Sequence, residues 1–249
     1  MKNFLRTAVV FLLTFEAQLV LKKYRPEIIA ITGSVGKTSA KDAIATALGD
    51  NPDIRKSKKS QNSDIGVPLT VIGAENQWES FFGWLGVLIR GCIVAFGRKT
   101  YPRTLILEVG ADHPGDIVAI APWLKPDVVV MTGVPNIPVH IAFFDSADSV
   151  LAEKAELVRH MRGGGTLILN GDNERARKLS QEHAGTIITY GMASTNNLFA
   201  SHMEPLISEG YPRTQRAEQW SPSCDDCSAR CARGLPSCDD CSARTARGL

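Results

Sequence analysis

Short apolar runs and stretches of helical periodicity alternate along the middle of the chain. The apolar runs are rich in valine, isoleucine and leucine, as buried parallel strands are, and they cover residues 28–32, 104–109, 127–132, 166–169 and 186–190. The helical stretches include residues 37–48, 146–161 and 173–182. This alternation predicts an α/β fold with a mostly parallel sheet and helices on both faces. Ligands of such folds bind beyond the carboxyl ends of the strands, so we expect the functional residues there.

Residues 1–25 form a separate apolar segment. Within it, residues 4–21 are interrupted by Arg6, Glu16 and Gln18, and they are marginal as a membrane span, which needs about 20 apolar residues. Two interpretations stay open: an anchoring or interfacial helix, and an amphipathic helix packed on the domain. Basic residues at 22–25 would keep the rest of the chain on the cytoplasmic side. We therefore expect a cytoplasmic protein, with peripheral contact to the inner face of the membrane through residues 4–21.

Composition and charge narrow the class of protein. A hydrophobic fraction of 44% is that of a globular protein, and a net charge of +2 gives no reason to expect nucleic-acid binding. We interpret the basic run at residues 55–59 as a solvated loop. Residues 81–97 are apolar apart from Arg90, and they fit either a buried helix or a helix near a membrane. Cys92 stands alone in the first two hundred residues, and a single cysteine of the buried type suits a reducing cytosol.

The end of the chain is a tandem repeat. Residues 222–235 recur as residues 236–249 with one difference, Cys231 against Thr245. The two C-x-x-C pairs, one in each copy, have the spacing of a zinc site. The repeats carry almost no apolar residues, however, so they cannot bury a core. We interpret residues 213–249 as a disordered low-complexity tail from a repetitive or out-of-frame stretch of coding DNA.

Residues 29–39 show the clearest chemistry. The sequence Ile-Ala-Ile-Thr-Gly-Ser-Val-Gly-Lys-Thr-Ser predicts a strand, a glycine loop and the start of a helix, which is how proteins hold a nucleoside triphosphate. The glycines allow a tight turn whose N–H groups converge on phosphate, Lys37 can reach the terminal phosphates, and Thr38 can ligate Mg²⁺. The standard motif has a glycine where this chain has Ile31. The predicted phosphate-binding residues are Gly33, Ser34, Val35, Gly36, Lys37, Thr38 and Ser39.

Three more residues lie near the predicted strand ends or the helix that follows. Glu108 is near the end of an apolar strand, where a carboxylate is costly to bury without a partner, and a metal ion would supply one. His140 lies in a proline-braced loop, where a histidine is usually a surface residue. Lys154 lies on a predicted helix, where a lysine is normally solvated.

In their order along the chain, these segments resemble the Mur ligases, the ATP-dependent amide-forming enzymes of peptidoglycan precursor synthesis. The resemblance includes an asparagine-bearing segment that ends in Ile-Gly-Val-Pro, then Glu-Val-Gly-Ala with Pro-Gly-Asp-Ile, the His140 loop, Lys154-Ala-Glu, and Leu-Asn-Gly-Asp-Asn at residues 169–173. It is strongest to the members that join D-Ala-D-Ala to UDP-N-acetylmuramoyl-tripeptide, and it implies those two small-molecule substrates and the central ATP-binding fold of the family.

The resemblance also implies roles for single residues, with ATP and Mg²⁺ as cofactors. Lys37 would hold the β- and γ-phosphates, and Thr38 and Glu108 would bind the bridging Mg²⁺. His140 would ligate a second Mg²⁺, and Lys154 matches a lysine that relatives carry as a carbamate, an anionic metal ligand. The nucleotide would also contact Asn62 and, near the adenine, Asn170. A substrate carboxylate would then form an acyl phosphate, which an amine attacks without a covalent enzyme intermediate.

The resemblance covers about residues 26–212, which we take as a central ATPase domain that is itself incomplete. The family's N-terminal domain is replaced by the apolar segment, and its C-terminal domain is missing. We expect a truncated or frameshifted product that binds ATP·Mg²⁺ weakly and joins no substrates by itself. Two alternatives stay open: an amide ligase for another acid, of the folyl-polyglutamate or cyanophycin type, and a membrane-associated nucleotide-binding module without ligase activity.

Overall fold

The computed structural model describes residues 2–49, 51–58, 61–77, 80–98, 100–134 and 143–200. The predicted tail at 213–249 and its cysteines, like His140, lie outside the described residues, and the domain boundaries at 26–212 and 213–249 stay predictions. The helices are α1 (Lys2–Tyr24), α2 (Lys37–Leu48), α3 (Gly66–Ile72), α4 (Phe81–Phe96), α5 (Asp116–Leu124), α6 (Ala147–Arg159), α7 (Glu174–Lys178) and the 3₁₀ helix η2 (Leu179–Glu182). The strands are β1 (Glu27–Thr32), β2 (Ile54–Lys56), β3 (Thr104–Glu108), β4 (Val128–Met131), β5 (Thr166–Asn170), β6 (Thr186–Gly191) and β7 (Leu198–Phe199).

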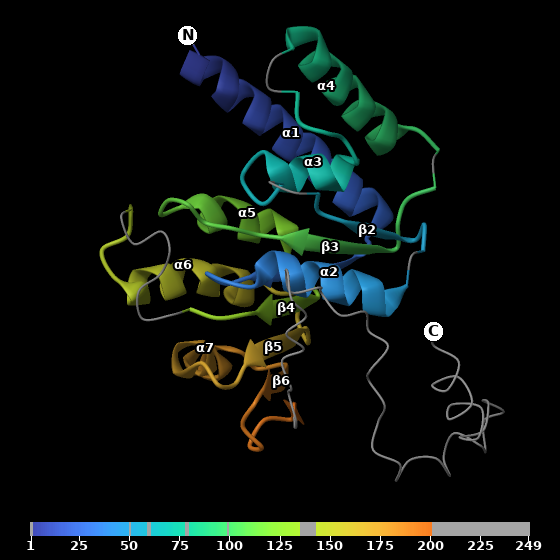
Figure 1. Cartoon of the computed structure of the whole chain (residues 1–249). Coiled ribbons are helices and arrows are strands. Elements are labelled where there is room, and N and C mark those ends of the chain that lie inside the picture. The colour runs from blue at the N-terminus through green and yellow to red at the C-terminus, as the bar shows by residue number, and fades with distance from the viewer. Residues whose placement is uncertain are drawn as a thin grey trace, which may run out of the picture. The chain divides into compact units, whose positions relative to one another are not determined.

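The strands form one sheet in the order β2-β3-β1-β4-β5-β6-β7 (Figure 1). All pairings between these strands are parallel. β1 lies between β3 and β4, and its register places Ile31 beside both Glu108 and Val130. The carboxyl ends of the three strands therefore meet at one edge of the sheet, which is where the sequence predicts the functional residues.

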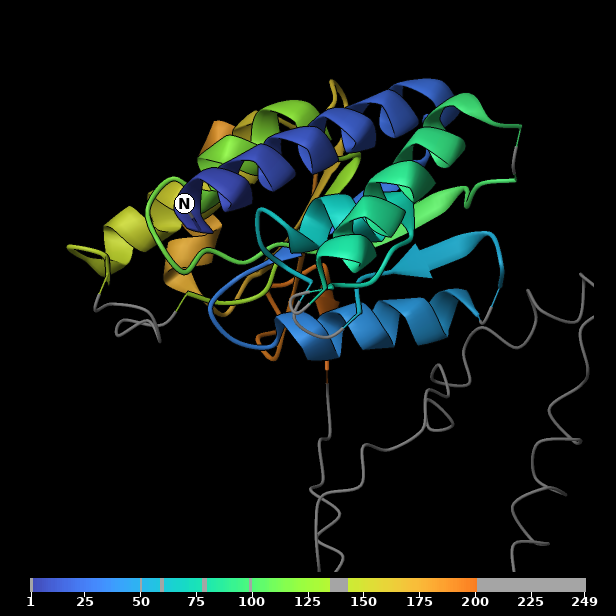
Figure 2. The ribbon, with the colours of Figure 1, turned by 90° about the horizontal axis from the view of Figure 1, so that it is seen from above.

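Helices cover both faces of the sheet, but unequally. In Figure 2, α2 lies below the sheet, whereas α1, α3, α4 and α5 lie above it. The buried clusters agree, because Ile31, Ile106 and Val130 pack against α2 on one face. Residues of β1 and β3 that point the other way, such as Ala30 and Leu107, join the larger cluster with the remaining helices. The predicted parallel α/β sheet with helices on both faces is confirmed.

α1 packs on the domain over its central and C-terminal turns. Leu13, Ala17 and Val20 are fully buried, and the ring of Tyr24 stacks on Tyr101 with centroids 4.5 Å apart. Tyr24 also donates a hydrogen bond to the Val94 carbonyl of α4 at 3.1 Å. In the described part of the chain, no helix has the length and apolarity that crossing a membrane requires. Of the two interpretations of residues 4–21, the packed helix accounts for these contacts.

Two predictions about the polar residues around these helices are wrong. The start of the basic run is strand β2, where Arg55 donates a hydrogen bond to the Val71 carbonyl at 2.7 Å and lies over the Tyr101 ring. The aliphatic part of an arginine can be buried while its guanidinium satisfies backbone oxygens, so charge alone does not predict a loop. Cys92 is exposed, and its thiol lies 3.4 Å from the Glu16 carboxylate.

Candidate nucleotide-binding site

The loop between β1 and α2 needs glycine at two positions for different reasons. Gly33 has φ +143°, and a Cβ atom there would lie 1.9 Å from the Thr132 hydroxyl oxygen. Gly36 has φ +79° in open space and is the N-cap of α2. Both backbone conformations are rare for residues with a side chain. The loop therefore adopts the turn that the sequence predicts, directly before the N-terminus of a helix.

The end of β4 holds this loop in place. The Ser34 N–H donates to the Gly133 carbonyl at 2.7 Å, and the Thr132 hydroxyl lies 2.7 Å from the Val35 carbonyl. Two oxygen acceptors of the loop, those of Thr32 and Val35, are thus within reach of one hydroxyl. Sequence reasoning missed Thr132, because a threonine at the end of a strand carries no signal for a contact with a residue almost a hundred positions away.

Lys37 folds back over the loop. Its Nζ donates a hydrogen bond to the Gly33 carbonyl at 3.0 Å. Burial lowers the pKa of Lys37, and the carboxylates of Glu108 and Asp112 partly offset that effect. The Lys37 ammonium is therefore held against the backbone of the loop, and the carboxylates of Glu108 and Asp112 are near enough to influence its charge. Ser34 is half-buried, whereas Val35 and Ser39 are exposed.

Glu108 is the centre of the polar contacts at the end of β3. Its carboxylate accepts a hydrogen bond from the Thr38 hydroxyl at 2.9 Å and one from the Asn62 amide at 3.4 Å. The buried Lys41 ammonium lies 3.9 Å from the same carboxylate. A metal ion, which the sequence suggests as a partner for Glu108, is thus not the only one available, because three side chains of the protein already contact its carboxylate. Sequence reasoning missed Lys41, although it lies one helical turn after Lys37.

Lys154 is buried on α6, with 2% of its surface exposed, so the usual expectation of a solvated helix lysine is wrong here. The pKa of Lys154 is lowered to about 8, mainly by burial and further by the charge of Lys37, while Glu153 and Asp112 act in the opposite direction. No carboxylate in the described residues lies within 4.0 Å of its ammonium. The charge of Lys37 thus contributes to the lowered pKa of Lys154.

Glu153, which the sequence did not single out, fixes the segment beside Lys154. Its carboxylate accepts hydrogen bonds from the N–H groups of Gly115, Ile117 and Val118 at 3.0, 2.6 and 3.2 Å. These are orphan donors at the start of α5. Glu153 thereby ties α6 to the Pro-Gly-Asp-Ile segment.

The roles of the last two predicted residues, Asn170 and His140, both stay predictions. Asn170 ends β5, two strands from β1 on the same edge of the sheet, and its side-chain oxygen accepts the Asp172 N–H at 3.1 Å. Among the described residues, no hydrogen bond or ion pair joins Asn170 to the loop, and its role near an adenine stays a prediction. His140 lies outside the described residues.

The residues around Glu108 suit a magnesium ion. A threonine hydroxyl and a carboxylate are hard oxygen ligands, and Mg²⁺ is usually held by one or two such groups together with phosphate oxygens and water. Thr38 and Glu108 provide that pair in contact with each other. The described residues contain no cluster of three or more histidine, cysteine, aspartate or glutamate side chains that could hold a metal.

Known proteins are similar to this chain in sequence. Residues 94–210 match the Mur ligase middle domain. A UDP-N-acetylmuramoyl-tripeptide--D-alanyl-D-alanine ligase of Mycobacterium bovis is 29% identical over 173 residues, which are 70% of this chain and 29% of that protein. The ligase of the same name from Synechocystis sp. is 29% identical over 190 residues, 76% of this chain and 36% of the relative. The chain thus spans about a third of the length of these relatives.

Solved structures agree at the level of the fold. MurF from Acinetobacter baumannii has a TM-score of 0.59 at 22% identity, covering 81% of this chain and 38% of the other. MurF ligase from Thermotoga maritima, solved in complex with ADP, has a TM-score of 0.57 at 22% identity, over 74% of this chain and 37% of the other. The predicted resemblance to the Mur ligases is confirmed: residues 94–210, a little under half of the chain, match the middle domain of that family, and the fold is shared with these solved structures.

Proposed function

We propose that this chain is the ATP-binding part of an ATP-dependent acid–amino-acid ligase that joins D-Ala-D-Ala to UDP-N-acetylmuramoyl-tripeptide. The observation that carries the proposal is that the loop between β1 and α2, here called the phosphate-type loop, converges with Glu108. Thr38 follows the loop lysine directly, and its hydroxyl lies 2.9 Å from the Glu108 carboxylate on the neighbouring strand. The names of the relatives supply the substrates of the proposal.

The side chains of the site have distinct roles in this proposal. The loop N–H groups and Lys37 bind the β- and γ-phosphates of ATP, and Thr38 and Glu108 hold Mg²⁺. When bound, Mg²⁺ neutralises charge on the phosphates. A substrate carboxylate oxygen attacks the γ-phosphorus and ADP leaves, which gives an acyl phosphate. The amine nitrogen then attacks the acyl carbon, inorganic phosphate leaves, and the nitrogen loses a proton. The protein acts by position and electrostatics.

Lys154 has a second role in the proposal. Only the neutral amine of a lysine can add CO₂ to form a carbamate, and a pKa of about 8 leaves a useful neutral fraction near neutral pH. We infer that Lys154 is converted to a carbamate, which would replace a buried cation by an anion opposite Lys37. His140 would complete a second Mg²⁺ site, and Asn62 and Asn170 would contact the nucleotide.

We further propose that the protein works in the cytoplasm and touches the inner face of the membrane through α1. Phe11 and Phe15 are 69% and 53% exposed on α1, and Phe82 and Phe96 of α4 are 80% and 75% exposed. Exposed aromatic side chains of this number favour an interface with lipid or protein. Sedimentation with phospholipid vesicles tests the contact, and Phe11→Ser/Phe15→Ser should reduce it.

The ligase proposal is tested by nucleotide binding in the presence of the acid substrate. Calorimetry measures the affinity of the chain for ATP·Mg²⁺ with and without UDP-N-acetylmuramoyl-tripeptide, and phosphate release is then followed after D-Ala-D-Ala is added. Tighter ATP·Mg²⁺ binding with the tripeptide, or phosphate release that requires it, supports the ligase. ATP·Mg²⁺ binding that the tripeptide leaves unchanged contradicts the ligase and favours a nucleotide-binding module. A response to a folate substrate instead favours the folyl-polyglutamate alternative.

A further inference from the structure

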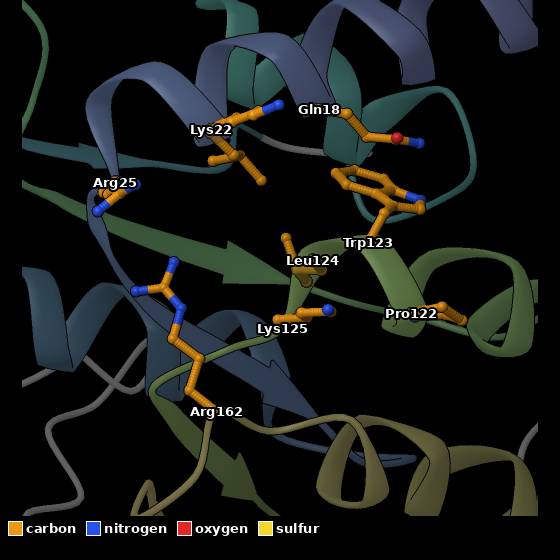
Figure 3. Close-up of a pocket in the computed structure, with 9 residues that line it drawn as sticks. Gln18, Lys22, Arg25, Pro122, Trp123, Leu124, Lys125 and Arg162 are labelled. Carbon is orange, nitrogen blue, oxygen red and sulfur yellow. The ribbon is translucent and has the colours of Figure 1, made fainter.

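A cavity of about 620 Å³ lies between α1, α5 and the loop after α6, and the proposed reaction does not use it (Figure 3). Gln18 and Lys22 reach it from α1, Trp123 comes from α5, and the Arg162 side chain extends from below toward α1. Arg25 and Lys125 line it directly after α1 and α5.

The cavity lies at the edge of the sheet opposite to the phosphate-type loop. Arg25 comes just before β1, Lys125 just before β4, and Arg162 shortly before β5. These positions are at the amino ends of the parallel strands, whereas the loop follows the carboxyl end of β1. The cavity is therefore separate from the proposed ATP site.

The charges around the cavity are largely uncompensated. None of its lining residues in the described part of the chain is acidic, and four are cations. Arg162 is paired with Asp127 at 2.9 Å. None of the ion pairs found among the described residues involves Lys22, Arg25 or Lys125. Three positive charges thus face a concave surface without a carboxylate of their own.

The backbone at two of these cations is strained. Among the described residues, Arg25 with φ +49° and Lys125 with φ +47° are the non-glycine residues with positive φ. Each follows a helix and donates its N–H to a helix carbonyl, that of Leu21 and that of Ala121. Glycine is the usual residue at such helix ends, because it has no Cβ. Residues with strained backbone cluster at functional sites. The strain at two cations of one cavity therefore suggests a functional role for this cavity.

We propose that this cavity binds a phosphate-bearing anion, such as a diphosphate or the headgroup of an anionic lipid. Lys22, Arg25, Lys125 and Arg162 supply charge-assisted hydrogen bonds to phosphate oxygens, Gln18 supplies an amide, and the indole of Trp123 forms a flat wall. The inference is independent of the proposed ligase activity.

The strain provides a fold-preserving test. Arg25→Gly/Lys125→Gly removes two charges at positions where glycine suits the backbone, so the melting temperature should equal or exceed that of the parent. Pyrophosphate is titrated into the full chain in the Lys37→Ala background, which weakens the loop site, and binding is followed by calorimetry and by tryptophan fluorescence. We expect pyrophosphate to bind, and the double glycine variant to weaken binding about tenfold or more. Arg177→Ala/Lys178→Ala, which removes two exposed charges from α7, should leave it unchanged.

A second arm identifies the source of the phosphate. The same variants are sedimented with vesicles of phosphatidylcholine alone and of equal parts phosphatidylcholine and phosphatidylglycerol. Binding to anionic vesicles that the double glycine variant loses, without pyrophosphate binding, assigns a lipid headgroup; pyrophosphate binding without vesicle binding assigns a soluble phosphate compound. Binding of neither probe overturns the proposal, and so does binding that the double glycine variant leaves unchanged.

Discussion

Gly33→Ala is the substitution that probes the geometry of the loop most sharply. The new Cβ atom would lie 1.9 Å from the Thr132 hydroxyl oxygen, on a residue with φ +143°. Thr132 must then rotate, and its hydroxyl loses the contact with the Val35 carbonyl at 2.7 Å that holds the loop to β4. A single methyl group should therefore both strain the backbone and detach the loop.

The expected loss of stability follows from these two effects. A side chain in a sparsely populated region of φ and ψ costs about 1–3 kcal/mol, and the lost hydrogen bond costs about 1 kcal/mol. Alanine offsets up to about 1 kcal/mol of this lost stability, because it restricts the unfolded chain more than glycine does. Together these terms predict that Gly33→Ala lowers the free energy of unfolding by about 1–4 kcal/mol, with about 2–3 kcal/mol in the middle of that range.

Urea unfolding measures this change, and two further variants assign its cause. Gly36→Ala has a positive φ of +79° but open space around the new Cβ, so it should cost only about 1 kcal/mol. Thr132→Ala removes the atom that clashes, and in a double-mutant cycle it should recover about 1 kcal/mol or more of the Gly33→Ala loss. Equal losses for Gly33→Ala and Gly36→Ala, together with additive effects in the cycle, would refute the contact between the loop and Thr132.

Three further predictions concern buried ionisable side chains. The pKa of Lys154 is about 8 in the folded protein against 10.5 ordinarily, so between these pH values the unfolded chain binds more protons and the free energy of unfolding rises with pH. In metal-free urea titrations, the parent should gain about 3 kcal/mol relative to Lys154→Met over this range. Lys178→Met, which changes an exposed lysine, should leave the pH dependence of the parent unchanged. Glu153→Ala should cost about 2–3 kcal/mol, because three N–H groups of α5 lose their acceptor; an unchanged urea midpoint would contradict this. Burial raises the pKa of Glu16, so the free energy of unfolding of the parent should fall as the pH rises above the pKa of an ordinary glutamate. Glu16→Gln should remove this fall. Parallel pH profiles of the two proteins would show that Glu16 is solvated.

The centre of the sheet could be predicted from the sequence because β1, β3 and β4 are largely buried on both faces. Continuous apolar runs identify β1, β3, β4, β5 and β6 within a residue or so at their ends. β2 was missed, because it is three residues long and contains Arg55 and Lys56. Arg55 contacts Tyr101 and an α3 carbonyl, and these partners are distant in sequence and give no local signal.

The site was predictable where chemistry is local and unpredictable where it depends on packing. Gly33, Gly36, Lys37 and Thr38 follow one another in a recognisable order. The burial of Lys154, by contrast, results from how α6 packs on the sheet. Lys41 and Thr132 reach the site through strand order and helix rotation, so they become visible only in three dimensions.

The central claim is that Thr38 and Glu108 hold Mg²⁺ against a nucleotide bound to the loop. The most direct measurement is the calorimetric affinity for ATP, with Mg²⁺ and with a chelator, for the parent and for Glu108→Gln. Glutamine keeps the size of the side chain and an oxygen that can accept the Thr38 hydrogen bond, but it removes the charge. We predict that Mg²⁺ tightens ATP binding to the parent about tenfold or more and that Glu108→Gln loses this gain. An equal effect of Mg²⁺ on both proteins, or none on the parent, would contradict the account.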